Sequence, residues 1–223
     1  MGDTIPCVEK LWFFMKIDTF LFDLDGTLVD SVADITTTVN LLREKVGLGP
    51  LSRADVATRV GDGARVLLER SLPQGMFSEE LFRLFRCFYE EHLCDETYLY
   101  PGIVDFLKTR QPCRQAVVTN KPTAFSEKLL EKLGVRNHFA AVLGPECCPE
   151  KKPHPAPVLK ALQMLKADPE TAVMIGDHHT DLNAGNAAGV KTCFCAWGIG
   201  ENGGVSYDYL AESPADLMKI FPA

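Results

Sequence analysis

The sequence lacks the excess of basic residues with which nucleic-acid-binding proteins neutralise phosphates. Its 23 Lys and Arg are outnumbered by 30 Asp and Glu, which gives a net charge of -7. It also lacks a long hydrophobic run, because the apolar segment 11–15 is too short to span a membrane and carries no signal-peptide cleavage pattern. We therefore expect a cytoplasmic protein without nucleic-acid or membrane partners. An anionic small substrate would need a local cationic site.

Metal-binding cysteine patterns are missing as well. The chain has 8 cysteines, but none form a C-x-x-C pair and none share a zinc-site spacing with histidine. We expect reduced, mostly buried thiols. No Pro/Gly/Ser-rich stretch is long enough for a disordered linker, and 223 residues suffice for one large α/β domain or a core with a smaller insert.

Short apolar segments bounded by turn or polar residues predict buried parallel strands. They lie at 17–22, 114–119, 140–143, 171–175 and 191–196. Helical patterns separate or follow them at 103–110, 122–133, 155–166 and 180–188. Strands that alternate with helices form right-handed βαβ units, so the expected fold class is α/β with a doubly wound parallel sheet.

The segment 31–97 breaks this alternation because it contains helical patterns only. These cover 32–46, 53–58, 64–71 and 79–94. Ser31 with Asp34, and Ser52 with Asp55, have the spacing of N-terminal capping boxes. We therefore expect a catalytic core made of 16–30 and 98–223, a small all-helical cap at 31–97 inserted after the first strand, and an N-terminal extension at 1–15.

The strongest chemical signal is Asp23-Leu24-Asp25-Gly26-Thr27-Leu28, directly after the first strand. In an open α/β sheet, ligands bind in the crevice outside the carboxyl ends of the strands, where both aspartates would lie. Two carboxylates so close repel each other unless a cation compensates, which favours a hard, oxygen-seeking metal such as Mg²⁺.

A second acidic cluster, Asp177 and Asp181, follows a later strand. It could serve as a helix N-cap or, with the first pair, bring up to four carboxylates to one ion. His178 and His179 lie between these aspartates and could touch substrate or metal. Partly exposed positions at a helix start are the simpler interpretation, because Mg²⁺ prefers oxygen ligands to imidazole.

Two further loops of the same sheet edge offer phosphate-binding groups. Thr119-Asn120 ends the second parallel strand, and Lys151-Lys152-Pro153 precedes a helix. A hydroxyl at a strand end and a lysine pair in a loop are each weak signals in isolation. These two signals become informative through their order along the chain relative to the two acidic segments.

Taken together, these segments resemble the motifs of the haloacid dehalogenase superfamily over the whole chain from Lys16 onward. The helical insert is similar to the C1-type cap of that superfamily. Within it, Val60-Gly61-Asp62-Gly63-Ala64 resembles the cap loop of bacterial phosphoglycolate phosphatases. The resemblance implies a Rossmann-like core and a Mg²⁺-dependent phosphomonoester hydrolase that acts on a small phosphorylated metabolite, with 2-phosphoglycolate as the first candidate.

The resemblance also implies roles for individual residues. Asp23 would attack phosphorus and Asp25 would act as general acid and then base, while Thr119, Asn120 and Lys152 would bind the phosphorylated substrate. The implied Mg²⁺ ligands are Asp23, the Asp25 backbone carbonyl, Asp177 and Asp181. In the cap loop we expect Arg59, Gly61 and Arg65 to bind substrate, because an arginine can pair with a substrate carboxylate.

Two alternatives remain open at this stage. A phosphomutase would share the first motif and pass the phosphoryl group between two hydroxyls of a sugar phosphate. A catalytically retired binding protein would keep the same scaffold. Dehalogenation is disfavoured, because a halide leaving group does not need the acid/base that Asp25 supplies. The oligomeric state is left open by the sequence.

Overall fold

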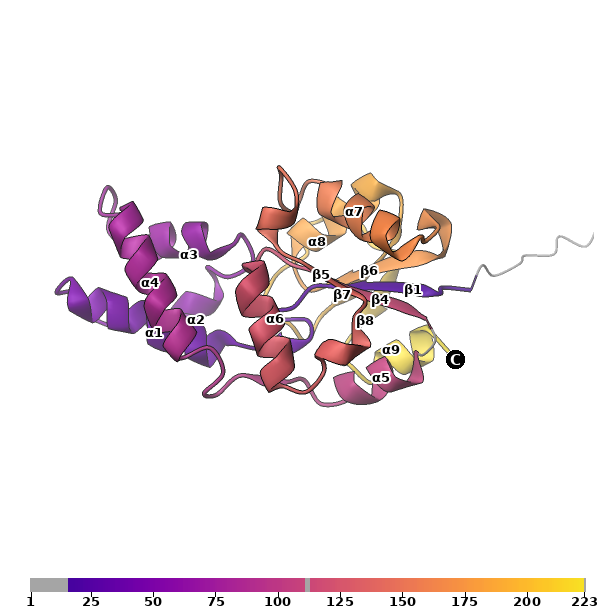
Figure 1. The fold of residues 1–223 in the computed structure, drawn as a ribbon, viewed down its shortest axis with the longest axis horizontal. Helices are drawn as coiled ribbons and strands as arrows, with labels where there is room; N and C mark the ends of the chain where they lie inside the picture. The colour runs from indigo at the N-terminus through magenta and orange to yellow at the C-terminus, as the bar shows by residue number, and fades with distance from the viewer. Residues whose placement is uncertain (1–15, 111–112, 223) are drawn as a thin grey trace, which may run out of the picture.

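The computed structural model describes residues 16–110 and 113–222, and their centre is a parallel sheet of six strands in the order β5-β4-β1-β6-β7-β8 (Figure 1). The strands are β1 Thr19–Phe22, β4 Arg114–Val118, β5 Ala141–Leu143, β6 Ala172–Gly176, β7 Lys191–Cys195 and β8 Tyr209–Ala211. The predicted doubly wound α/β fold is confirmed. The extension predicted at 1–15 lies outside the described residues.

Helices cover both faces of the sheet because side chains alternate along each strand. On β1, Phe20 and Phe22 contribute to one apolar cluster and Leu21 to the other. The first cluster is covered by α5 Ile103–Thr109, α6 Thr123–Lys132 and α9 Asp216–Ile220, and the second by α7 Ala156–Leu165 and α8 His179–Ala188. Figure 1 shows α7 and α8 above the sheet and α5 and α9 below it.

The strand order reverses next to β1. Strands β4 and β5 extend the sheet on one side of β1, whereas β6, β7 and β8 extend it on the other. The loops after β1 and β6 therefore leave a crevice at this switch point, where open α/β sheets bind ligands. Asp23 follows β1 there and donates its backbone N–H to the Ile175 carbonyl at 2.9 Å, and Asp177 follows β6.

Four helices lie together at one end of the molecule (Figure 1). They are α1 Val32–Lys45, α2 Arg53–Ala57, α3 Ala64–Ser71 and α4 Glu79–Glu91. The chain enters this segment through β2 Val29–Asp30 and leaves it through β3 Tyr98–Leu99, and the two strands pair antiparallel. We keep residues 31–97 as the proposed cap.

One of the two expected capping boxes is wrong. Ser52 and Asp55 form the predicted box, with the Ser52 hydroxyl accepting from the Asp55 N–H. The Ser31 side chain makes no cap hydrogen bond with its helix. It donates instead to Asp25 Oδ1 at 2.6 Å, so a partner in the crevice displaces the local cap.

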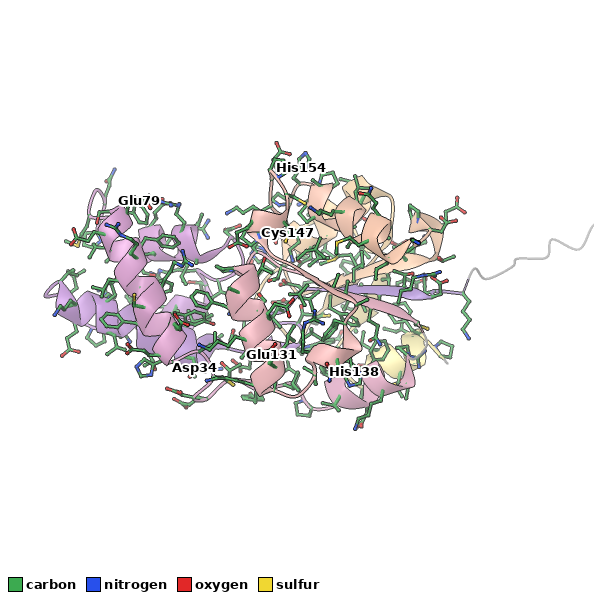
Figure 2. All side chains as sticks on the ribbon, viewed as in Figure 1. Asp34, Glu79, Glu131, His138, Cys147 and His154 are labelled. Atoms are coloured by element: carbon green, nitrogen blue, oxygen red, sulfur yellow. The ribbon has the colours of Figure 1, made fainter. Side chains whose placement is uncertain are left out.

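Asp34, the other half of that expected box, connects the two ends of the cap. Its carboxylate accepts hydrogen bonds from the backbone N–H groups of residues 95, 96 and 97 at 2.9–3.0 Å and from the Thr97 hydroxyl at 2.6 Å. Asp34 is 1% exposed and lies at the end of the cap that is nearer the sheet (Figure 2). It therefore fixes the segment that returns the chain to the core.

The other departures from the predicted elements are small. Helix α6 begins at Thr123 rather than Pro122, and α4 ends at Glu91 rather than at residue 94. The short elements β2, β3, β8 and α9 were not predicted. Short 3-10 helices join the larger elements at Arg136–His138, Pro145–Cys147 and Pro169–Thr171. Within the described ranges, no helix combines the length and the apolar character needed to cross a lipid bilayer.

Candidate active site

A buried ion pair occupies the centre of the crevice. Asp23 is 7% exposed and Lys152 is 2% exposed. Lys152 Nζ donates to Asp23 Oδ1 at 2.8 Å, to Asp181 Oδ1 at 2.6 Å and to the Val118 carbonyl at 2.6 Å. Burial by itself lowers the pKa of Lys152, but the carboxylates of Asp181 and Asp23 outweigh burial and raise it. The lysine is therefore held as an ammonium with a fixed position.

Three carboxylates converge around this ammonium. Oxygen atoms of Asp23, Asp177 and Asp181 lie within 4.8 Å of one another, and all three residues are buried. Burial, Asp181 and Asp25 raise the pKa of Asp23 to about 6 in spite of Lys152. Burial, Asp23 and Asp181 raise the pKa of Asp177 to about 7. One ammonium cannot balance three carboxylates, so this donor set fits a hard divalent cation.

Backbone and hydroxyl donors fix the direction of Asp177. Thr27 Oγ1 donates to Oδ1 at 2.8 Å, and the N–H groups of Ile199 and Gly200 donate to Oδ2 at 3.0 and 2.9 Å. Gly26 lets this carboxylate approach closely, since a Cβ there would lie 2.2 Å from Asp177 Oδ2 and the φ of Gly26 is +88°. The loop at Ile199 and Gly200 was missed by the sequence analysis because nothing in its composition marks it.

Asp25 points away from this acidic cluster toward two other partners. Its Oδ1 accepts from Ser31 Oγ at 2.6 Å and from Lys121 Nζ at 2.8 Å, and its Oδ2 accepts from Lys121 at 3.1 Å. Lys121 is 6% exposed and also donates to the hydroxyl of Tyr89 on cap helix α4. Burial lowers the pKa of Lys121, but Asp25 and Tyr89 reverse this and raise it.

Lys121 and Tyr89 were not among the site residues expected from the sequence. A lysine two positions after Thr119 at the carboxyl edge of the sheet was a usable signal for a cation in the crevice. Tyr89 gave no such signal, because an aromatic residue on an amphipathic helix is usually a core residue.

Thr119 and Asn120 are buried beside the ion pair, at 4% exposure each. The Asn120 amide nitrogen donates to the Gly61 carbonyl of the cap loop at 2.9 Å and to the Lys152 carbonyl of the core at 3.0 Å. Its amide oxygen is buried and has no partner among the described residues.

A pocket of about 50 Å³ lies above these groups, between core and cap. Asp23, Asp25 and Thr119 contribute to its core side. Its cap side is mostly apolar and includes Leu67 and Phe85. Gly61 lines it too, and its binding of substrate stays a prediction. Of the lysines and arginines in the described ranges, Lys121 is the one that lines this pocket.

The structure does not place Arg59 and Arg65 in the pocket. Arg59 Nε donates to the Arg70 carbonyl at 3.1 Å, and the Arg65 guanidinium pairs with Glu79 and packs over the rings of Phe77 and Phe82. Figure 2 shows Glu79 at the end of the cap remote from the sheet. Their expected substrate contacts thus find no support in the geometry, because other partners already hold both guanidinium groups.

His178 and His179 lie at the start of α8 and are partly exposed, in agreement with the simpler interpretation. The His178 N–H donates to Asp181 Oδ2 at 3.0 Å, so Asp181 serves both the N-terminal cap of α8 and the ion pair with Lys152. The two rings and Asp62 form a second group whose donor atoms lie within 4.8 Å of one another. Asp62 is already paired with Arg70 at 2.6 Å.

Comparisons with known proteins agree with this geometry. Residues 20–195 match the family model of haloacid dehalogenase-like hydrolases. The chain is 36% identical over 213 residues to a phosphoglycolate phosphatase of Chromobacterium violaceum, covering 92% of this chain and 96% of that protein. It is 37% identical over 203 residues to a phosphoglycolate phosphatase of Aquifex aeolicus, covering 90% and 94%.

Solved structures show the same similarity. The crystal structure of a protein named as a predicted phosphoglycolate phosphatase from Haemophilus somnus superposes with a TM-score of 0.84 at 32% identity. The alignment covers 92% of this chain and 97% of that one. The agreement therefore extends over the cap as well as the core.

Proposed function

The chain belongs to the haloacid dehalogenase-like hydrolases and is a phosphatase, and from this we propose that it hydrolyses 2-phosphoglycolate with the help of Mg²⁺. Relatives named phosphoglycolate phosphatase match it over at least 90% of its length, which includes the cap. That coverage supports a shared substrate more strongly than a match of the core alone, because fold similarity by itself does not fix a substrate.

The observation that carries the proposal is the small pocket between core and cap with Asp23 and Asp25 in its wall. Its volume is about 50 Å³. Leu67 and Phe85 of the cap limit the space on the side opposite these carboxylates. A two-carbon leaving group fits this space better than a sugar or a nucleoside.

We assign the covalent step to Asp23. Its Oδ1 accepts the hydrogen bond from Lys152, and we assign the attack on phosphorus to Oδ2. The new O–P bond forms as the ester P–O bond breaks, and Asp25, in its protonated form, gives its proton to the departing alkoxide. The Asp25 carboxylate then takes a proton from the water that attacks the aspartyl phosphate, which breaks the Asp23–phosphorus bond, restores the Asp23 carboxylate and the protonated Asp25 carboxyl group, and releases phosphate.

The charged phosphoryl oxygens need positive partners during both steps. Lys152 is rigidly placed beside Asp23 for this role, and the Thr119 hydroxyl is available in the same wall of the pocket. Asp23, Asp177, Asp181 and the Asp25 backbone carbonyl would hold Mg²⁺, which when bound supplies further positive charge beside the phosphoryl group. Asp181 would also keep Lys152 in place.

A phosphate-release assay tests the proposal. Purified protein is incubated with 2-phosphoglycolate and with a panel of sugar phosphates, nucleotides and pyrophosphate, each with Mg²⁺ and with excess EDTA. We expect the highest kcat/KM for 2-phosphoglycolate and no turnover in EDTA. A tenfold higher kcat/KM for a sugar phosphate, or an isomeric sugar phosphate as product, would contradict the proposed substrate or the hydrolase reaction.

A further inference from the structure

Lys121 is a buried cation that faces the place where the leaving group must lie. Its ammonium contacts the carboxylate of Asp25, the proposed proton donor to the leaving oxygen, at 2.8 and 3.1 Å. A lysine buried this deeply needs a compensating partner, and one carboxylate already satisfies that need. Its position in the wall of the substrate pocket therefore calls for an explanation beyond stability.

Lys121 and Tyr89 have hydrogen-bond donors that their contacts with each other and with Asp25 do not use. The ammonium has three protons, of which Asp25 and Tyr89 each engage at least one. The Tyr89 oxygen accepts from Lys121, and its own proton makes no hydrogen bond among the described residues. Burial raises the pKa of Tyr89 to about 12, so this proton stays on the oxygen at neutral pH. Two adjacent groups can thus donate to one anion.

Tyr89 is held firmly enough to act as such a donor. Its ring is 4% exposed, stacks on Phe85 with a centroid distance of 6.1 Å and meets the edge of Phe125 at 5.3 Å. Phe85 belongs to the cap and Phe125 to core helix α6, so the hydroxyl is fixed where cap and core meet. The pocket around it is mostly apolar, which strengthens any charge-assisted hydrogen bond.

The geometry of 2-phosphoglycolate matches this arrangement. A single methylene carbon separates its ester oxygen from its carboxylate, so a carboxylate oxygen lies about 3 Å from the ester oxygen. Asp25 must contact the ester oxygen to protonate it, and Lys121 lies within hydrogen-bond distance of Asp25. One ammonium can therefore bridge the acid and the substrate carboxylate. A carboxylate farther along a longer leaving group would not reach this position.

We infer that Lys121 and the Tyr89 hydroxyl form the subsite that recognises the carboxylate of the leaving group, and that Lys121 determines the preference for a 2-phosphorylated two-carbon acid. This inference rests on the proposed function. Lys121 of the core and Tyr89 of the cap, not Arg59 and Arg65, then bind the substrate carboxylate. The subsite is complete only when α4 lies against the core.

The test compares two substrates of equal length that differ in the carboxylate, namely 2-phosphoglycolate and ethyl phosphate. The measured quantity is the ratio of their kcat/KM values, from which any general damage to Asp25 cancels. Lys121→Gln should lower this ratio by about 10- to 100-fold, the usual effect of losing a hydrogen bond to a charged group. The loss should appear mainly in KM for 2-phosphoglycolate. Tyr89→Phe should change the ratio in the same direction by a smaller factor.

Two variants serve as controls. Lys121→Arg keeps the charge and should restore most of the ratio. Lys128→Gln removes the same charge from a partly exposed lysine that pairs with Glu90 and does not line the pocket, so the ratio should stay at the wild-type value. Tyr89→Phe also carries the test by itself if Lys121→Gln does not fold.

The outcomes separate the inference from the proposed function. A wild-type protein without preference for 2-phosphoglycolate over ethyl phosphate would contradict the proposed substrate. A wild-type protein with that preference, combined with an unchanged ratio in folded Lys121→Gln or Tyr89→Phe, would overturn the inference and leave the proposed substrate standing. An equal fall of the ratio in Lys128→Gln would show that general charge, not the subsite, sets the preference.

Discussion

The ammonium of Lys152 donates a 2.8 Å hydrogen bond to the carboxylate of Asp23, although 129 positions separate the two residues in the sequence. Both side chains are buried, and the carbonyl of Val118 holds the same ammonium at 2.6 Å. The lysine therefore links the ends of β1 and β4 before any substrate arrives. A positive charge that is already in place costs little reorganisation during the reaction.

Replacement of Asp23 by asparagine and replacement of Asp25 by asparagine should affect different steps of the reaction. Asp23→Asn removes the nucleophile, so we expect near-zero turnover and no phosphorylated protein. Asp25→Asn removes the acid/base group and should lower turnover by about 10² to 10⁴. An activated aryl phosphate should still phosphorylate Asp23 in that variant, because its leaving group departs without protonation. Mass spectrometry after rapid quench locates the phosphate, and phosphate on residue 25 of Asp23→Asn would overturn the assignment.

Mg²⁺ should stabilise the fold itself. The buried carboxylates of Asp23, Asp177 and Asp181 repel one another, so a cation that binds only the folded state raises Tm. A free concentration of 100 times Kd adds about 2.7 kcal/mol to the free energy of unfolding. Differential scanning calorimetry in Mg²⁺ and in EDTA measures the shift.

Asp177→Asn is the matched control for this measurement. It should have a higher Tm than the wild-type protein in EDTA, because one repelling charge is gone, and a smaller increase with Mg²⁺. An equal Mg²⁺-dependent increase in both proteins would place the stabilising cation elsewhere.

Asp34 should contribute more to stability than an ordinary helix cap. Asp34→Ala leaves three backbone N–H groups and the Thr97 hydroxyl without their acceptor, and Thr97 is buried. We expect a loss of about 3 kcal/mol or more in the free energy of unfolding. Ser52→Ala removes an exposed N-cap and should cost about 1 kcal/mol. Urea denaturation of both variants decides the order, and an equal loss would contradict it.

Arg65→Ala tests the sequence-based assignment that the geometry does not support. Arg65 pairs with Glu79 on the cap surface, with 47% and 67% of the two side chains exposed. A surface substitution of this kind changes free energies by about 0.5 kcal/mol at most, so the ratio of kcat/KM for 2-phosphoglycolate and ethyl phosphate should change by about twofold or less. A tenfold fall would return Arg65 to the substrate-binding residues.

The main strands and helices of the core could be predicted from the sequence, because local patterns of apolar residues determine them. Buried strands read as apolar runs, and a parallel sheet brings the residues after each strand to one edge, so Asp23 and Asp177 could be placed together before the structure was known. Strands β2 and β3 have two residues each, which is too short for any periodicity. Strand β8 has three residues, of which one is buried, so its composition gives no strand signal.

Contacts that depend on how the cap packs could not be predicted. Ser31 has the spacing of a helix cap, in which its hydroxyl would accept from a backbone N–H, yet the hydroxyl donates to Asp25, because a hydrogen bond to a charged carboxylate is stronger than one between neutral groups. Lys121 and Tyr89 are 32 residues apart and meet only after α4 has docked on the core. Local sequence patterns carry no information about such docking.

The Asn120 side chain bonds the carbonyl of Gly61 in the cap and the carbonyl of Lys152 in the core at the same time. This shared amide limits how freely related enzymes can exchange their inserts. A chimaera that receives a foreign segment at 31–97 must present a backbone acceptor at the position of Gly61, or the loop that carries the catalytic lysine loses its link to the new insert. Diversification by module swapping is thus constrained at this contact, while exposed positions such as Glu79 are free to vary.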